Sequence, residues 1–112
     1  MRIISQDGTI DIPYNLFSLI VASGKCKDVE YACIYCHNIS APHGTKLAEY
    51  SSKEKALKAM EMLREHHEKV TFLKTIINTE KVALFVSFLS ETEFDEMTQN
   101  YFQFPKDDEV EV

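Results

Sequence analysis

Residues 51–70, SSKEKALKAMEMLREHHEKV, decide the fold, because the spacing of the apolar residues changes within this stretch. Residues of one face recur at intervals of three and four, the period of an amphipathic helix: Ala56, Ala59, Met60, Leu63, His67 and Val70. Ser51 and Glu54 have the spacing of a capping box, which predicts the first turn. The sequence therefore predicts a long helix over about residues 52–69.

The fifty residues before this helix have the pattern of an antiparallel meander. Asp7 and Gly8 stand between two pairs of isoleucines, which predicts a hairpin within residues 1–14. Further strands are expected at residues 16–22, 28–37 and 46–50, separated by a turn at 23–25 and a loop at 38–45. We therefore expect four to five short strands, with the long helix packed on one face of them.

Beyond Val70 the pattern is mixed, and residues 70–78 fit either a continued helix or a strand. Residues 80–89 predict a second, shorter helix, and Ser90 and Glu93 form a capping box that predicts a helical segment as far as Met97. Residues 101–105 alternate like an edge strand. The chain is thus expected to be a single α+β domain over residues 1–105, followed by a mobile acidic tail at 106–112.

Composition excludes some classes of function. The 112 residues carry 18 acidic and 12 basic side chains, a net charge of −6, whereas a nucleic-acid binder needs an excess of positive charge. No apolar run is long enough to cross a bilayer, and the first residues lack the apolar core of a secretory signal. We therefore expect a cytoplasmic protein that binds neither nucleic acid directly nor a membrane, with its three cysteines reduced.

The segment CIYCH at residues 33–37 raises the question of a metal site. Its spacing matches the attachment signature of c-type haem, but that chemistry requires export. Zinc is an alternative, with Cys26, Cys33, Cys36 and His37 as ligands, or His43 in place of His37. On a strand, however, Cys33 and Cys36 point to opposite faces. We therefore expect the cysteines to be packing residues, with no metal and no cofactor.

Catalytic residues are not evident. Cys26 or Cys36 could form a nucleophilic pair with His43, but nothing in the sequence orients such a pair. His66 and His67 are adjacent on the predicted helix and diverge by about 100°. Because no nucleophile, base and orienting group stand at a recognisable spacing, we expect no enzymatic activity.

Two sets of residues are candidates for binding. The first consists of carboxylates and one aromatic residue that could enter a basic groove on a partner protein: Glu91, Glu93, Asp95, Glu96, Tyr101, Asp107, Asp108 and Glu109. The alternative set lies at the start of the long helix, where free amides and lysines could hold the phosphate of a signalling nucleotide: Tyr50, Ser51, Ser52, Lys53 and Lys55. An edge strand at residues 1–5 or 101–104 could also pair with itself across a two-fold axis, which would give a homodimer.

Three segments carry a resemblance to known proteins. Residues 1–8, MRIISQDG, with DIPY at 11–14, then GTKLAEYSSKEKA at 44–56 and FQFPKDDEV at 102–110, resemble small proteins of phages and integrated mobile elements of Gram-positive bacteria. Mobile elements carry many small acidic proteins that disable host defence by binding, among them anti-CRISPR proteins that fill the basic channel of an effector nuclease. The resemblance therefore implies a non-enzymatic accessory protein that binds and occludes a host protein.

Overall fold

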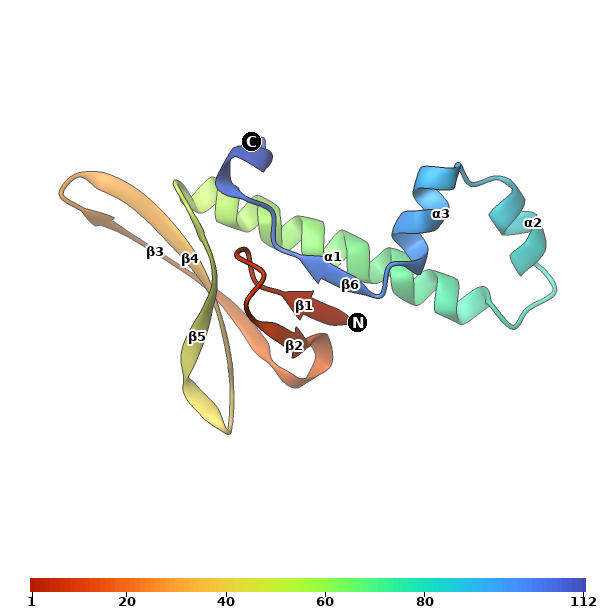
Figure 1. The fold of residues 1–112 in the computed structure, drawn as a ribbon, viewed down its shortest axis with the longest axis horizontal. Helices are drawn as coiled ribbons and strands as arrows, with labels where there is room; N and C mark the ends of the chain where they lie inside the picture. Colours follow the sequence, from red (N-terminus) through yellow and green to blue (C-terminus); the bar gives the residue numbers. More distant parts are fainter.

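The computed structural model in Figure 1 describes all residues of the chain except Ala41. It has the α+β architecture that the sequence predicts, in an elongated form of 57 × 33 × 19 Å. The strands are β1 (Arg2–Ile4), β2 (Asp11–Pro13), β3 (Ser18–Cys26), β4 (Val29–Asn38), β5 (Ala41–Tyr50) and β6 (Tyr101–Gln103). The helices are α1 (Lys53–Ile76), α2 (Val82–Ser87) and α3 (Glu91–Thr98), with short 3-10 turns η1 (Tyr14–Leu16) and η2 (Asp107–Glu109).

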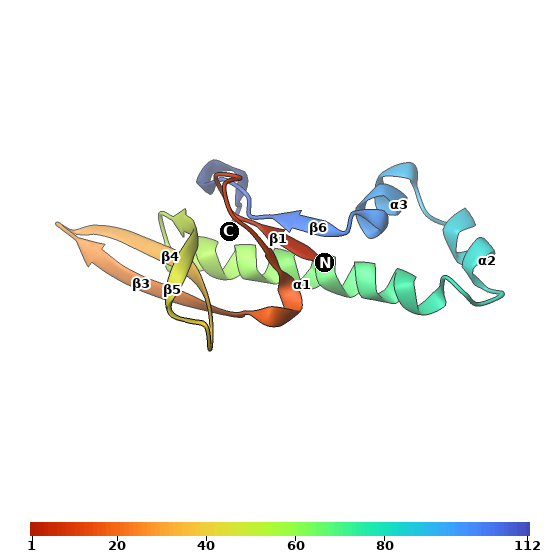
Figure 2. The same ribbon diagram turned by 60° about the horizontal axis from the view of Figure 1, so that its bottom comes forward.

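The strands form two small sheets beside α1. The first has the order β3-β4-β5 and is antiparallel throughout. The second has the order β2-β1-β6, in which β1 pairs antiparallel with β2 and parallel with β6. Figures 1 and 2 show the β3–β4 hairpin projecting beyond one end of α1, while α2 and α3 lie at the other end. The molecule therefore presents two different surfaces at opposite ends of its longest dimension.

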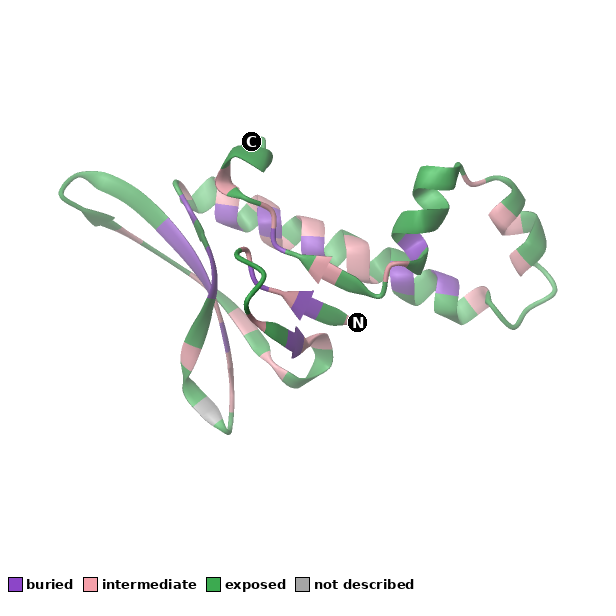
Figure 3. Cartoon of the chain, in the orientation of Figure 1, coloured by how far each residue is buried: buried purple, intermediate pink, exposed green. Residues whose placement is uncertain are grey.

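The main core lies where the first half of α1 meets both sheets (Figure 3). Ala56 and Ala59 are fully buried on α1, and their small side chains allow the strands to approach the helix closely. Leu63 packs in the same cluster, together with Ile3 of β1 and Ile34 of β4. This confirms the apolar stripe that the period of residues 51–70 predicts.

Helix α1 differs from its prediction at both ends. The N-cap is Ser52, whose side chain accepts a hydrogen bond from the amide of Lys55, so the assignment of the cap to Ser51 is wrong by one residue. At the other end the helix continues to Ile76, which decides in favour of helix for most of the undetermined segment 70–78. Val70 and Leu73 are buried there, and α3 packs against this part of α1. Val70 and Leu73 therefore continue the apolar stripe of the helix, and their burial stabilises helix in a segment that is also rich in strand-favouring residues.

The first sheet has longer strands than predicted. The turn expected at residues 23–25 is part of β3, and the chain turns instead at Lys27 and Asp28, which have φ angles of 51° and 65°. The loop expected at 38–45 is mostly strand, because β5 begins at residue 41 and accommodates its glycine and proline through register shifts against β4. Glycine and proline are tolerated in this way on an edge strand with bulges.

The N-terminal hairpin and the C-terminal helices agree with prediction. The carboxylate of Asp7 accepts hydrogen bonds from the hydroxyls of Ser5 and Thr9, both at 2.7 Å, and Gly8 has a φ of 78°. Ser90 and Glu93 form the predicted capping box at the start of α3. However, β1 lies between β2 and β6, so residues 1–5 are not an edge that could pair with a second copy, whereas β6 is an edge strand as predicted.

The C-terminal segment 106–112, expected as a mobile tail, packs against the domain. Val110 is 3% exposed and belongs to the main core. Gln6 helps to hold this region, because its side-chain amide donates to the carbonyl oxygens of Glu49 and Pro105 at 3.0 and 3.1 Å. The acidic residues of the segment are therefore fixed next to β5 and the start of α1.

Candidate functional site

The structure divides the predicted acidic binding set into two groups. Asp107 pairs with Lys55 near the start of α1, and Glu96 of α3 pairs with Lys69 further along the same helix. Fourteen residues of helix separate the two lysines, a distance of about 21 Å. Glu91, Glu93, Asp95, Glu96 and Tyr101 thus lie at one end of the molecule, whereas Asp107, Asp108 and Glu109 lie at the other end of α1.

Asp107 occupies the place that the alternative prediction assigns to a phosphate. Its carboxylate accepts a hydrogen bond from the backbone amide of Ser51 at 2.7 Å, and Lys55 donates to its backbone carbonyl oxygen at 2.9 Å. The amide of Lys53 donates to the carboxylate of Glu30 at 3.3 Å, and that of Lys55 donates to the side chain of Ser52. The protein's own groups therefore occupy three of the amides, those of Ser51, Lys53 and Lys55, and the ammonium group of Lys55, on which a nucleotide site would depend.

These contacts also change the acidity of the residues involved. The hydrogen bond from the Ser51 amide is the largest cause that lowers the pKa of Asp107, and Lys55 lowers it further. Tyr50 is almost fully buried, which raises the pKa of its phenol, and its hydroxyl donates to the carbonyl oxygen of Pro105 at 2.7 Å. Tyr50 and Asp107 are therefore structural groups that join the C-terminal segment to α1 and β5.

The cysteines are not brought together. Cys36 lies in the main core, whereas Cys33 contacts Glu49 on the other face of the sheet, with 3.7 Å between Sγ and Oε1. This agrees with the prediction that the two thiols point in opposite directions. Cys26 is paired with Val29 at the hairpin tip, four residues and about 13 Å along the strand from the pair that contains Cys33. Among the residues described, no group of three histidine, cysteine or carboxylate side chains could hold a metal ion.

Burial raises the pKa of both inner thiols, Cys33 and Cys36. A raised thiol pKa disfavours the thiolate, which is the reactive form in nucleophilic catalysis. Cys36 with His43, considered above as a nucleophilic pair, therefore has a thiol in the protonated state and a histidine on the exposed surface.

The helical histidines serve packing. His66 lies 2.8 Å from the carbonyl oxygen of Gln99 through its Nε2 atom, and its ring is near Phe102. His67 stacks on Tyr14 with 4.1 Å between the ring centroids. The two histidines thus point in different directions, and each joins α1 to a different part of the chain.

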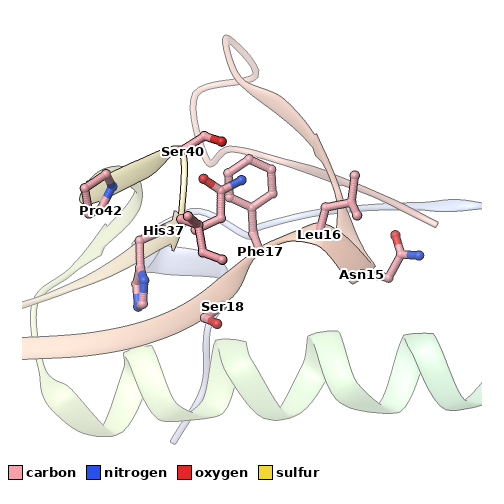
Figure 4. Close-up of a pocket in the computed structure, with 9 residues that line it drawn as sticks. Asn15, Leu16, Phe17, Ser18, His37, Ser40 and Pro42 are labelled. Atoms are coloured by element: carbon pink, nitrogen blue, oxygen red, sulfur yellow. The ribbon is translucent and has the colours of Figure 1, made fainter.

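A hollow of about 720 Å³, which was not predicted from the sequence, lies beside the 3-10 turn η1 (Figure 4). Two segments line it, one running from Asn15 to Ser18 and the other from His37 to Ser40 with Pro42. No aspartate, glutamate, lysine or arginine is among these residues. The hollow therefore offers apolar contacts and neutral hydrogen bonds, and it has no charged group for a phosphate.

The end formed by α2 and α3, residues 77–98, has a different character, and we call it the α2–α3 end. Five carboxylates and one lysine lie in this segment, which gives it a local charge of −4 out of the −6 of the whole chain. Phe88 is 79% exposed and Leu84 is 62% exposed, and Ile77 and Phe94 are exposed as well. Glu91, Glu93 and Asp95 are exposed on the neighbouring helix. Exposed apolar side chains and exposed carboxylates thus lie at the same end of the molecule.

Comparisons with known proteins do not indicate a family for this chain. No protein-family model, curated protein or solved structure matches the chain. Of the helices described, none combines the length and the apolar character that a membrane span requires. The carboxylates of α3 were proposed from the sequence for partner binding, but the exposed Leu84 and Phe88 were not singled out. Helical spacing in a sequence does not show which face of a short helix stays exposed, and both residues are exposed in the structure.

Proposed function

We propose that the protein is a non-enzymatic binding protein, and that it uses the α2–α3 end to occlude a host protein. The observation that carries this proposal is the exposure of Leu84 and Phe88 beside the carboxylates of α3. An exposed cluster of large apolar residues is unfavourable in water and is typical of a surface that a partner covers. The resemblance of three segments to proteins of phages and mobile elements supports a host protein as that partner.

The chemistry of this end suits a partner with a basic, partly apolar groove. Aromatic side chains contribute most of the affinity when they fill a pocket, and Phe88 is the most exposed aromatic residue of this surface. The carboxylates of Glu91, Glu93 and Asp95 lie on the following helix at the same end, where they would attract a positively charged surface and orient the encounter. Tyr101 follows α3 and is exposed, so it could extend the contact along β6.

The opposite acidic group is less suited to this role. Asp107 is already bound to Ser51 and Lys55, so its charge is partly neutralised within the protein. A partner that used Asp107 would have to replace those bonds. We therefore assign partner binding to Glu91, Glu93, Asp95 and Tyr101, and a structural role to Asp107.

Affinity capture from a lysate of a Gram-positive host, at about 150 mM salt, tests the proposal. The wild type should retain a specific protein, and Phe88→Ala and the double variant Glu91→Gln, Glu93→Gln should each lose most of it. The matched controls are Leu57→Ala, an exposed apolar residue on α1, and Asp108→Asn, an exposed carboxylate outside this surface. The proposal is wrong if the two sets of variants capture the same protein equally, or if the wild type retains only chaperones.

A further inference from the structure

The strand β3 presents a long and regular open edge. It has nine residues and lies at the end of the β3-β4-β5 order, so that one side of the strand has no neighbour among the residues described. Its register against β4 is continuous from Ser18 to Cys26. Open edges of this length favour pairing with another strand, and proteins usually protect them.

The opposite edge of the same sheet shows such protection. β5 contains Pro42, has two register shifts against β4, and carries the charged residues Lys46 and Glu49. β3 contains no proline and no register shift, and Lys25 near its tip is its only charged residue. β3 therefore lacks the features that protect the β5 edge from pairing.

The hairpin geometry shows which backbone groups face the open side. The turn at Lys27 and Asp28 has two residues with positive φ, as in a type I′ turn, and Cys26 and Val29 close it. In such a hairpin the closing pair exchanges both hydrogen bonds, and every second pair after it does the same. Gly24, Ala22, Ile20 and Ser18 therefore bond to β4, and the alternate residues Leu19, Val21, Ser23 and Lys25 direct their N–H and C=O groups outward.

We propose that this edge pairs with the β3 strand of a second copy of the chain, antiparallel and with a two-fold axis at Ala22. In this register Val21 lies opposite Ser23 of the second copy, and Leu19 lies opposite its Lys25. All four outward residues of each strand then exchange both of their hydrogen bonds. A shift of the register by two residues would leave outward groups at each end of the strand unpaired, so this arrangement uses the edge most fully.

The side chains fit the same register. Ala22 would face Ala22 of the second copy at a pair without hydrogen bonds, where the Cα atoms approach to about 4.5 Å and a small residue is suited. Ile20, which is 48% exposed, would lie beside Gly24 of the second copy. The Tyr31 hydroxyl comes within 3.0 Å of the position of a Cβ on Gly24, so the tyrosine covers the glycine and offers Ile20 an apolar neighbour across the axis.

Charge favours a second copy in spite of the net charge of −6. Residues 18–38, which form the hairpin, contain two lysines and two carboxylates, so they are neutral in sum. Most of the negative charge lies in the α2–α3 end, which Figure 2 shows at the far end of the molecule. Two copies can therefore approach through β3 without opposing like charges at the contact.

Sedimentation equilibrium of the purified wild type and of Ser23→Pro tests the inference. Ser23 is exposed and its N–H points outward, so a proline there removes a hydrogen bond to the second copy and none to β4. The wild type should have twice the mass of one chain, and Ser23→Pro should have the mass of a single chain with an unchanged circular dichroism spectrum. A wild type that stays monomeric at every concentration, or a dimer that survives the substitution, overturns the inference.

Cross-linking gives a second test that does not depend on how well Ser23→Pro folds. In a Cys26→Ser background, Ala22→Cys should form an intermolecular disulfide readily with oxidised glutathione, because the two Cα atoms would be close enough. Ile20→Cys is the matched control on the same face, and its two copies would lie about 14 Å apart, too far for a disulfide. Equal cross-linking of the two variants, or none in Ala22→Cys, contradicts the Ala22 axis.

Discussion

Removal of the Asp107 carboxylate should destabilise the protein by separating the C-terminal segment from the start of α1. Asp107→Ala loses the 2.7 Å hydrogen bond from the amide of Ser51, to which a net contribution of about 1 kcal/mol is appropriate because the carboxylate is partly exposed. The pair with Lys55, at 3.4 Å, adds up to about 0.5 kcal/mol, since both side chains remain in contact with water. The free energy of unfolding should therefore fall by about 1.5 kcal/mol.

Thermal unfolding followed by circular dichroism measures this loss. For a chain of this length a loss of about 1.5 kcal/mol lowers Tm by about 6 °C. Asp108→Ala, which removes the same charge from the exposed neighbouring residue, should shift Tm by much less. Asp107→Asn keeps an acceptor oxygen for the Ser51 amide and should fall between the two.

The stabilising contribution of Asp107 should decrease at acidic pH. The pKa of Asp107 is lowered from its ordinary value of 3.8 in the folded protein, so the charged form is stabilised by folding. This contribution is fully present above the ordinary pKa and is lost as the pH falls through the lowered one. The difference in Tm between wild type and Asp107→Ala should thus shrink at acidic pH. If Asp107→Ala and Asp108→Ala unfold alike at neutral pH, the C-terminal segment is not held in the way described.

Three further predictions concern other parts of the fold. Leu63→Ala, at a fully buried position of α1, should lower the free energy of unfolding by about 2–4 kcal/mol in urea denaturation. Tyr50→Phe should lower it by about 1 kcal/mol, because the carbonyl oxygen of Pro105 loses its 2.7 Å hydrogen bond. The hydroxyl of Thr9 is the largest cause that lowers the pKa of Asp7 from 3.8 to about 2, so wild type should lose more stability than Asp7→Asn as the pH falls between these two values. Urea midpoints for the first two, and Tm against pH for the third, check them.

Local patterns predicted the elements that depend on neighbours in the sequence. The turn at Asp7 and Gly8, the capping box at Ser90 and the stripe of α1 are each set by residues a few positions apart. The N-cap was displaced by one residue because Ser51 and Ser52 are equally suitable caps by type. Ser51 instead donates its amide to Asp107, which lies 56 residues away in the sequence. No pattern within the helix could have revealed that contact.

The candidate binding surface was less predictable, because the charge and hydrophobicity of a sequence do not show which residues are covered by the rest of the fold. Asp107 and Glu91 are both carboxylates in acidic stretches, yet Asp107 is bound within the protein and Glu91 is exposed. Leu84 and Leu63 both have helical spacing with other apolar residues, yet Leu84 is exposed and Leu63 is buried. The contacts of α1 with the sheets and with α3 decide both cases, and these contacts join residues far apart in the chain.

The two proposed surfaces, the edge of β3 and the α2–α3 end, lie at opposite ends of the molecule. The β3–β4 hairpin is neutral and lies at one end of the molecule, whereas the α2–α3 end holds most of the negative charge and lies at the other. Pairing through β3 would therefore leave Phe88 and the carboxylates of α3 accessible in both copies. A dimer of this kind binds two sites of one partner assembly with a higher effective affinity than a monomer, provided that the spacing matches. Ser23→Pro should then weaken capture of a multimeric partner while Phe88→Ala abolishes it, so the two substitutions separate the contribution of pairing from that of the contact itself.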